Sequence, residues 1–357
     1  MSFDLPKLSE AQQAALDKLL AGVKAGESIQ RLGGYAGTGK TVLMRYLYKH
    51  LGSLWGFCAF TGKAADMMRR KGISSSSTIH SLIYRRVEGA PPGKQWRLKT
   101  RGEVGVKGFA IDEGSMVSGQ IFRDLVSFDL PIVVVGDHGQ LPPVGEDAGV
   151  MKNPDITLEE IHRNAGSIAF FAEYLRKGGD PWLWDGPYES NGTSVELVSD
   201  IGRVTSYDQV LCAFIVTRNA LNRKALIELD RKDTEPQIGD RVMVLQNNRD
   251  VGVFNGQQGK IEKFVGDLLS FRPSYSNETI WLVPDPRGWL AEKKLEYKRT
   301  HKVPLDYAWA TTVHKAQGDE YDHVGVVEER CPLWEHSRWT YTAASRAKVK
   351  LSWRLLA

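Results

Sequence analysis

The chain has 357 residues, of which 42% are hydrophobic, and a formal net charge of only +4 at pH 7. That length exceeds what one hydrophobic core normally organises, so we expect two compact domains. Three widely separated cysteines, Cys58, Cys212 and Cys331, argue against a disulfide framework and a zinc site. The small net charge excludes a uniformly basic chain, so any nucleic-acid surface must be local.

The beginning of the chain, MSFDLPKLSEAQQ, lacks the basic and apolar run of a secretion signal. No apolar stretch approaches the roughly 18 residues of a membrane span, so we expect a cytoplasmic protein with no membrane partner. The chain as a whole is nearly neutral, but segment 84–107 is basic, because it holds seven Lys or Arg against two Glu. This basic segment is the local candidate for a nucleic-acid surface.

The first half of the chain alternates helical and strand patterns. Apolar residues at helical spacing follow Ser9, a typical helix cap, as far as Val23. The stretch SIQRLGGYAGTGKT has the order strand, glycine loop and helix start. Apolar runs at 54–60, 106–113 and 130–137 predict strands buried on both faces of a parallel sheet. We therefore expect an α/β domain.

The second half resumes the α/β pattern and then interrupts it. The stretch LCAFIVTRNALNRKALIEL, residues 211–229, is typical of a strand followed by a helix. Residues 239–271 then read as short strands separated by turn signals at Asn255-Gly256 and Gly266-Asp267. This change of pattern predicts a small β-barrel inserted in an α/β domain.

Residues 34–41, GYAGTGKT, fit the phosphate-binding pattern G-x-x-x-x-G-K-[ST] at every fixed position. Glycines let backbone N–H groups turn toward phosphate oxygens at a helix start, Lys40 reaches the β and γ phosphates, and Thr41 offers a hydroxyl to Mg²⁺. An ordinary glycine-rich turn is the alternative, and a P-loop alone leaves kinase, GTPase, transporter and motor open. The predicted nucleotide ligands are Gly34, Gly37, Thr38, Gly39, Lys40 and Thr41.

Two further motifs favour hydrolysis. FAIDEGSM places Asp112 and Glu113 at the end of an apolar strand, where an aspartate can hold Mg²⁺ and a glutamate can polarise the attacking water. GDHGQLPPV places Gln140 after the next strand, where it could contact the γ-phosphate or that water. A solvated acidic turn and a rigid proline loop are the alternative interpretations.

Taken in order, these motifs resemble those of a superfamily 1 DNA helicase, and within it the RecD-like group. Further motifs carry the resemblance: LSEAQ with Gln12, FTGKAA (60–65), STIHSLIY (77–84), LEEIHRN with Arg163, ATTVHKAQGDEYDHV (310–324) and YTAASRAK with Arg346. Two motifs depart from the usual family pattern: His138 and Gly139 follow Asp137 in one, and Ala344 and Ser345 precede Arg346 in the other. Neither departure removes a charged group.

The resemblance implies an α/β fold of two RecA-like P-loop motor domains, residues 1–165 and 166–357. It implies a β-hairpin pin inserted in the first at 84–107 and a small SH3-like β-barrel inserted in the second at 238–300. It also implies that ATP hydrolysis with Mg²⁺ drives 5′→3′ translocation on single-stranded DNA and duplex unwinding.

The resemblance also assigns roles to individual residues. It implies that the catalytic residues are Lys40, Asp112, Glu113, Gln140 and two arginine fingers, Arg163 and Arg346. Nucleotide contacts beyond the P-loop are Gln12, at the adenine, Gly318 and Glu320, while Thr41 and Asp112 hold the metal. Nucleic-acid contacts are Thr61, Lys63, Thr78, His80, Thr312, His314 and Lys315.

Two predictions concern the inserted segments. Trp96 lies among cations in the basic segment, so we interpret it as a stacking contact that helps to split the duplex, although it could instead anchor the hairpin to its own domain. The barrel could clamp the strand through Arg249, Asn255 and Lys260, or could be a structural spacer.

The expected partners are single-stranded and forked DNA, bound by a monomer in the cytoplasm, or in the host cytoplasm if a phage encodes the chain. The sequence identifies no replication or recombination protein as a partner of the chain. Two alternatives stay open: a translocase that strips proteins from single strands without efficient unwinding, and an ATP-gated nucleic-acid-binding switch. A small-molecule P-loop kinase leaves TVHKAQG and YTAASRAK unexplained.

Overall fold

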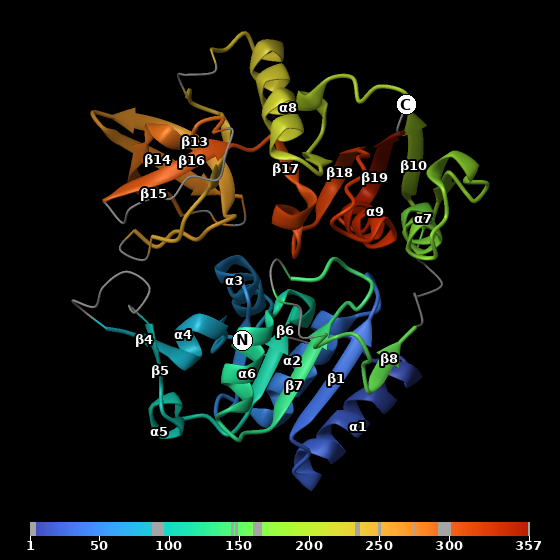
Figure 1. Cartoon of the computed structure of the whole chain (residues 1–357), viewed down its shortest axis with the longest axis vertical. Coiled ribbons are helices and arrows are strands. Elements are labelled where there is room, and N and C mark those ends of the chain that lie inside the picture. Colours follow the sequence, from blue (N-terminus) through green and yellow to red (C-terminus); the bar gives the residue numbers. More distant parts are fainter. Residues whose placement is uncertain are drawn as a thin grey trace. The chain divides into compact units, whose positions relative to one another are not determined.

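The computed structural model describes residues 5–87, 96–143, 146, 149–159, 166–232, 236–248, 251–274, 276, 278–291 and 301–355. The chain divides into two compact units, Met1–Asn164 and Ala165–Ala357 (Figure 1). Each unit is built around its own six-stranded sheet. Among the described residues, no helix combines the length and the apolar character that crossing a bilayer requires.

The sheet of the first unit is parallel throughout and has the strand order β3-β2-β6-β7-β1-β8. Its strands are β1 (Ile29–Gly34), β2 (Gly56–Ala59), β3 (Ser77–Thr78), β6 (Phe109–Asp112), β7 (Ile132–Gly136) and β8 (Ile156–Leu158). The four strands predicted from the apolar runs and from the stretch before the P-loop are therefore confirmed as β1, β2, β6 and β7.

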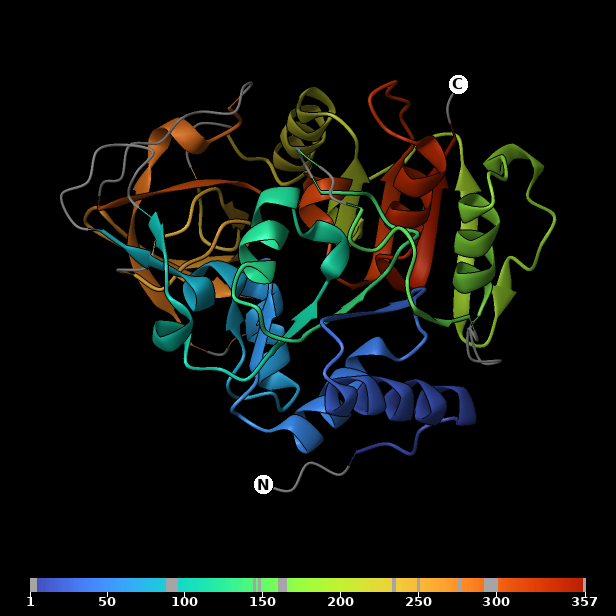
Figure 2. The ribbon, with the colours of Figure 1, turned by 60° about the horizontal axis from the view of Figure 1, so that its bottom comes forward.

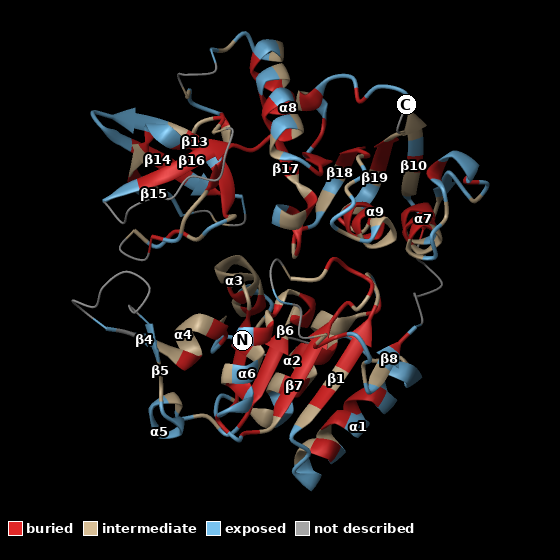
Figure 3. Ribbon diagram, in the orientation of Figure 1, coloured by how far each residue is buried: buried red, intermediate tan, exposed pale blue. Residues whose placement is uncertain are grey.

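The inner strands of this sheet, β2, β6, β7 and β1, are largely buried because helices cover both faces. Along β7, Val133 and Val135 pack with α1 and α2, whereas Ile132 and Val134 pack on the opposite side with α4 and α6. Successive strand residues point to opposite faces, so an unbroken apolar run is needed here. Figure 3 shows the buried strands of this sheet and the exposed outer surface of α1.

The helices of the first unit connect the strands. They are α1 (Glu10–Ala25), α2 (Lys40–Leu51), α3 (Gly62–Arg70), α4 (Ile79–Ile83), α5 (Arg101–Val104) and α6 (Gly119–Val126), with a 3-10 turn η1 (Gly114–Met116). Ser9 caps α1 as predicted, since its hydroxyl accepts from the Gln12 N–H and its own N–H donates to Gln12 Oε1.

A two-stranded antiparallel ribbon stands apart from the sheet in the basic segment. It pairs β4 (Tyr84–Arg86) with β5 (Trp96–Leu98), and Arg86 lies opposite Trp96. The turn APPGK that joins the strands lies outside the described residues. The predicted strand-like flanks of the hairpin are present.

The second unit has the strand order β17-β11-β18-β19-β10-β9. Its elements are α7 (Ser167–Arg176), η2 (Pro181–Leu183), β9 (Glu189–Ser190), β10 (Thr193–Val198), η3 (Val204–Ser206), β11 (Gln209–Cys212), α8 (Ile215–Glu228), β17 (Ala310–Thr312), η5 (Val313–Ala316), β18 (Tyr321–Val327), α9 (His336–Ala344) and β19 (Ala347–Arg354). All pairings are parallel except that of β9 with β10. In Figure 2, α7 lies alongside β10.

A closed five-stranded barrel is inserted between α8 and β17. Its strands are β12 (Arg241–Val244), β13 (Gln258–Val265), β14 (Leu268–Pro273), β15 (Ile280–Asp285) and β16 (Lys302–Tyr307), and η4 (Pro286–Gly288) follows β15. The predicted turn at Gly266-Asp267 joins β13 to β14. The barrel extends beyond the predicted end at residue 300, because β16 closes it by pairing with the distant β12 as well as β15.

Candidate nucleotide and nucleic-acid site

Three predicted catalytic motifs of the first unit meet at one edge of its sheet. The P-loop follows β1, Asp112 ends β6 and Asp137 follows β7. These three strands are parallel neighbours, so their carboxyl ends lie together. In open α/β sheets this edge is where ligands bind.

The P-loop has the backbone that phosphate binding requires. Gly37 and Gly39 have φ angles of 80° and 84°, in the left-handed region that favours glycine, and Gly39 caps the start of α2. The Lys40 ammonium donates to the carbonyl oxygens of Gly34 and Tyr35 at 2.7 and 2.8 Å. The lysine charge is therefore held against the loop, next to the helix N-terminus that would face an anion.

Gln12 ties α1 to the P-loop. Its Nε2 donates to the Thr38 carbonyl oxygen at 3.0 Å, and its side chain is only 5% exposed. A Cβ on Gly39 would lie 2.3 Å from this Nε2, so a side chain there would displace the Gln12 amide, and the φ of 84° also favours glycine. Adenine contact by Gln12 stays a prediction, and the structure gives the residue a supporting role beneath the loop.

The acidic pair lies where β6 ends. Burial raises the pKa of Asp112, while the N–H of Glu113, which donates to its Oδ1 at 3.0 Å, and the charge of Lys40 oppose that rise. Glu113 adopts a left-handed backbone, with φ of 55°, directly before η1. The backbone changes conformation between Asp112 and Glu113, so the two carboxylates can take different roles.

The loop after β7 holds Gln140 by its neighbour Asp137. Gln140 Nε2 donates to Asp137 Oδ2 at 3.1 Å, and the Gly139 N–H donates to Asp137 Oδ1 at 3.0 Å. Asp137 is completely buried and Gln140 is 4% exposed. These bonds hold the Gln140 side chain against Asp137, and contact of Gln140 with a phosphate or with the attacking water stays a prediction.

A contact between the P-loop and this second loop was not predicted from the sequence. The Tyr35 hydroxyl and His138 Nε2 are hydrogen bonded at 2.9 Å, and their rings lie 4.6 Å apart between centroids. The available signal was His138 itself, which departs from the usual family pattern. Its partner could not be found without the fold.

These residues fit a nucleotide with a bound Mg²⁺. Gly37 and Gly39, with left-handed φ angles, have no side chains, so phosphate oxygens can approach the loop backbone closely. The ammonium of Lys40 already places a positive charge against the loop. Thr41 and Asp112 would supply one hydroxyl and one carboxylate to the metal, with phosphate oxygens and water completing its shell. Among the described residues, no group of three or more His, Cys, Asp or Glu side chains forms a separate metal site.

Two predicted nucleic-acid contacts of the first unit also begin helices. Thr61 Oγ1 accepts from the Ala64 N–H at the start of α3, and Thr78 Oγ1 accepts from the Ser81 N–H at the start of α4, both at 3.1 Å. Lys63 lies within α3. His80 lies in α4 with its ring 5.4 Å from that of Tyr84. The cap preference of threonine was a readable signal for these helix starts.

The predicted contacts of the second unit come from two elements that lie together. Lys315, in η5 after β17, donates from Nζ to Asn255 Oδ1 of the barrel at 2.7 Å. Thr312 ends β17, and burial lowers the pKa of His314, whose ring lies 5.1 Å from that of Trp334. Thus the structure brings Asn255 and Lys315 together, and both side chains are exposed.

Arg346 is buried and hydrogen bonded within its own unit. Its guanidinium donates to the carbonyl oxygens of Thr342 and Asp319 at 3.1 and 3.0 Å and to Ser345 Oγ at 2.8 Å. Ser345, a departure from the family pattern, is therefore one of its acceptors. These three bonds use only part of the five N–H groups of the guanidinium, and its role as an arginine finger stays a prediction.

The remaining predicted residues are placed as follows. Gly318 has a left-handed φ of 81°, and Glu320 is exposed just before β18. Lys260 is exposed on β13. Trp96 is 45% exposed on β5 and so is not part of the core. Arg163 and Arg249 lie outside the described residues.

Comparison with known proteins gives the family. A family model described as an AAA domain matches residues 7–206, more than half of the 357-residue chain. The chain belongs to this AAA domain family. A second model, described as a UvrD-like helicase C-terminal domain, matches residues 307–352. Together the two family models match residues in both units of the chain.

Relatives of the chain include named helicases. A probable conjugal transfer protein TraA of Sinorhizobium fredii is 25% identical over 97% of this chain, which spans only 32% of that protein's length. The ATP-dependent DNA helicase Pif1 of Bdellovibrio bacteriovorus is 25% identical over 96% of this chain and 86% of its own length. The Dda helicase of phage T4 is 27% identical over 54% of this chain and 47% of its own length.

The RecD subunit of Mycobacterium tuberculosis RecBCD is 25% identical over 93% of this chain and 67% of its own length. The resemblance to the RecD-like group is confirmed, and the Dda helicase is among these relatives. Solved structures share the fold at 21% identity: Pif1 helicases at forked DNA, with a TM-score of 0.66, and Bacteroides Pif1 bound to single-stranded DNA, with 0.65. Each covers 97% of this chain and 92% of its own.

Proposed function

We propose that this protein is an ATP-dependent DNA helicase that moves 5′→3′ on single-stranded DNA and unwinds duplexes. The observation that carries the proposal is the convergence of the P-loop, Asp112, Glu113 and Gln140 at one edge of a parallel sheet. A phosphate cradle, a metal-binding acid, a second acid and a phosphate-sensing amide are the parts that triphosphate hydrolysis needs.

In this proposal each group of the first unit has one task. Lys40 and the P-loop N–H groups bind the phosphates, and Thr41 and Asp112 hold Mg²⁺, which supplies charge neutralisation when bound. Glu113 orients and polarises the attacking water, and Gln140 contacts the γ-phosphate or that water. Gln12 supports the loop and contacts adenine.

Further residues of the chain contribute positive charge and strand contacts. We assign Arg346 and Arg163 as arginine fingers, since guanidinium groups stabilise the charge of phosphoryl transfer, and Gly318 and Glu320 as further nucleotide contacts. We assign the strand contacts to Thr312, His314 and Lys315 with Asn255 of the barrel. In the first unit Thr61, Lys63, Thr78 and His80 take the same role.

Duplex separation is assigned to the ribbon of β4 and β5, as a pin. Trp96 is exposed there, next to Arg97, and an exposed aromatic ring can stack on an end base pair. The relatives' names support this assignment of substrate, since Pif1 and Dda are ATP-dependent DNA helicases. The partners that we propose are single-stranded and forked DNA, bound by a monomer with ATP and Mg²⁺ in the cytoplasm.

The experiment is steady-state ATP hydrolysis with and without single-stranded DNA, for the wild type, Lys40→Ala, Glu113→Gln and the matched control Lys49→Ala. Lys49 is exposed in the same helix as Lys40 but lies in its last turn. We expect DNA to stimulate the wild type and the control, and both site variants to lose at least about 100-fold in turnover. If single-stranded DNA does not change the rate of ATP hydrolysis, the result would instead favour an ATPase that does not act on DNA.

A further inference from the structure

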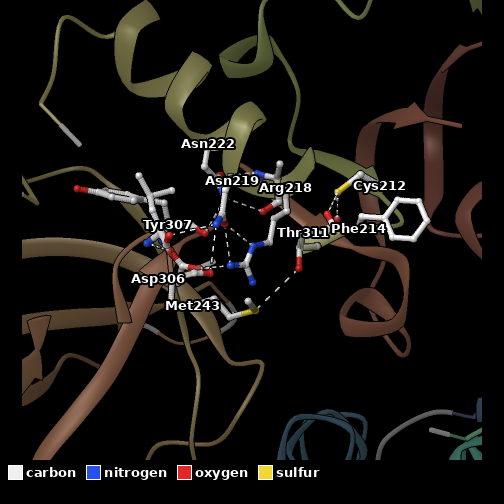
Figure 4. Close-up of polar contacts among 12 residues, drawn as sticks. Cys212, Phe214, Arg218, Asn219, Asn222, Met243, Asp306, Tyr307 and Thr311 are labelled. Carbon is white, nitrogen blue, oxygen red and sulfur yellow. Dashed lines mark hydrogen bonds and ion pairs between the residues drawn. The ribbon is translucent and has the colours of Figure 1, made fainter. Parts of the chain in front are cut away.

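Two arginines of the second unit are buried in different ways, and Arg218 of α8 is the first. It is 7% exposed, and its Nη2 lies 2.6 Å from Oδ2 of Asp306 on β16. Figure 4 shows Arg218 directed toward Asp306, which is completely buried. A buried guanidinium is costly unless it is paired and hydrogen bonded. Arg218 meets this requirement inside the unit, because a carboxylate neutralises it directly.

Arg346, which follows α9, is the second of these arginines. It is 4% exposed, and its guanidinium donates to two carbonyl oxygens and one hydroxyl oxygen, all of them neutral. In the part of the chain that the structure describes, no carboxylate forms an ion pair with it. Each terminal nitrogen carries two N–H groups, and these bonds occupy one of them. The guanidinium therefore keeps donors and charge for a further, anionic acceptor.

The direction of this guanidinium depends on the loop between η5 and β18. Arg346 Nη1 donates to the Asp319 carbonyl oxygen at 3.0 Å. The Asp319 side chain, in a residue that is 5% exposed, accepts at Oδ2 from the Tyr321 hydroxyl at 3.0 Å. The Tyr321 N–H donates to the Arg346 carbonyl oxygen at 2.8 Å. Three residues are thus joined in a closed triangle of hydrogen bonds.

The backbone of this loop is turned sharply just before Asp319. Gly318 has a left-handed φ of 81°, and the Asp319 N–H donates to the Ala316 carbonyl oxygen at 3.0 Å. A Cβ on Gly318 would meet no atom within 4 Å, so its φ alone favours glycine. A displacement of Asp319 would move the carbonyl oxygen that binds Arg346. The Tyr321 hydroxyl opposes such a displacement, because it holds the Asp319 side chain.

The charges of Asp319 and Arg346 both act on the Tyr321 phenol. Burial raises the pKa of Tyr321 well above its ordinary value, the charge of Asp319 raises it further, and the charge of Arg346 lowers it. The phenol therefore stays protonated near neutral pH and can donate to Asp319. The Asp319 carboxylate also compensates part of the Arg346 charge through space, without an ion pair.

We propose that Tyr321 and Asp319 are positioning residues for Arg346, which hold its guanidinium in the direction that meets the phosphate oxygens of the nucleotide. Tyr321 acts on the reacting groups only through Arg346. This positioning role rests on the proposed function, in which Arg346 is an arginine finger, and adds the residues that aim it.

The affinity for two states of the nucleotide separates positioning from a general loss of binding. Binding of a fluorescent ADP analogue with Mg²⁺ is measured with and without aluminium fluoride, which makes bound ADP resemble the transition state of phosphoryl transfer. An arginine finger stabilises that state. We expect Tyr321→Phe to bind ADP as the wild type does, and to lose about 3- to 10-fold in affinity with aluminium fluoride, the range of one hydrogen bond.

Asp319→Ala removes the same hydrogen bond from the other side, so we expect the same selective loss, and it replaces Tyr321→Phe if that variant does not fold. The matched control is Tyr207→Phe, which loses a hydroxyl bond to the Ile201 carbonyl oxygen in the same unit and should match the wild type in both states. Equal losses in the two states, or no loss in either, would overturn the positioning role.

The route through Arg346 is tested by Tyr321→Phe in an Arg346→Ala background. We expect no further loss of affinity with aluminium fluoride there, because the residue that Tyr321 positions is absent. The same loss in both backgrounds would show that Tyr321 acts independently of Arg346. In steady-state hydrolysis we expect Tyr321→Phe to lower kcat and to leave KM for ATP unchanged.

Failure of the proposed function would look different. A wild type that neither hydrolyses ATP nor binds ADP more tightly with aluminium fluoride would refute the ATPase itself. An Arg346→Ala variant that binds both states as the wild type does would refute the arginine finger. A wild type and Arg346→Ala that behave as proposed, with Tyr321→Phe indistinguishable from the wild type, would refute only the positioning role.

Discussion

The hydroxyl of Tyr35 in the P-loop is hydrogen bonded to Nε2 of His138, in the loop that also carries Gln140, at 2.9 Å. His138, which departs from the usual family pattern, therefore joins the P-loop to the loop after β7. A net hydrogen bond contributes about 0.5–1.5 kcal/mol. The bond therefore favours this relative position of the two loops by an amount of that order.

Removing only this hydroxyl should weaken nucleotide use. For Tyr35→Phe we expect kcat/KM for ATP to fall about 2- to 10-fold, the range that one net hydrogen bond supplies. The matched control is Tyr46→Phe, which also loses a hydroxyl hydrogen bond, to the Pro6 carbonyl oxygen, but on α2 away from the loop. Equal effects in the two variants would contradict a specific role for the Tyr35–His138 bond.

Trp96 should matter for strand separation more than for hydrolysis. We expect Trp96→Ala to lower the number of base pairs unwound per ATP at least about 5-fold, because base stacking on an aromatic ring contributes about 1–3 kcal/mol. Trp182→Ala is the control, since Trp182 is 60% exposed in the second unit. An unchanged ratio in correctly folded Trp96→Ala would remove Trp96 from the proposed pin.

The three cysteines should differ sharply in reactivity. Burial raises the pKa of the Cys58 and Cys212 thiols, so both stay protonated and inaccessible at pH 8, whereas Cys331 is partly exposed. Ellman's reagent should therefore label one thiol quickly in the native protein and three after unfolding. Rapid labelling of two or three native thiols would show that a unit opens readily.

Glu228 should make the stability of the second unit depend on pH. Burial opposes its ionisation, but bonds from the Thr205 N–H and hydroxyl and from the Val204 N–H outweigh burial and lower its pKa. A carboxyl whose folded-state pKa is depressed stabilises the fold above its ordinary pKa and loses that contribution as pH falls through the folded value.

Thus Glu228→Ala should lower the melting temperature of the second unit by roughly 2–4 °C at pH 7, for about 1 kcal/mol. The difference from wild type should shrink as pH falls below about 4.3, the ordinary glutamate pKa. Glu189→Ala, at an exposed position in the same unit, serves as the control. A difference that stays constant from pH 7 to pH 3 would contradict this role.

The strands of the first sheet were predictable because a parallel strand buried on both faces must be apolar throughout. Strand β7, within the predicted run 130–137, has every one of its residues buried for this reason. The end of the barrel was not predictable in the same way. Strand β16 is defined by pairing with β12 and β15, and periodicity carries no information about such distant partners.

The candidate site likewise has residues that local motifs predict and contacts that they do not. Lys40, Asp112 and Gln140 follow strands, so local motifs were enough to place them at one edge. The contacts that support them, Gln12 with Thr38 and Tyr35 with His138, join segments far apart in the chain. The pair of Arg218 and Asp306 is of the same kind, since either residue alone reads as an ordinary surface charge.

The central claim, that ATP hydrolysis drives directional movement on DNA, is tested most directly with duplexes that carry either a 5′ or a 3′ single-stranded tail. Unwinding is measured with ATP for the wild type and for Lys40→Ala. We predict that the wild type opens only the 5′-tailed duplex and that Lys40→Ala opens neither. Opening of the 3′-tailed duplex alone would contradict the polarity, and failure to open either, with ATP turnover indifferent to DNA, would contradict the motor itself.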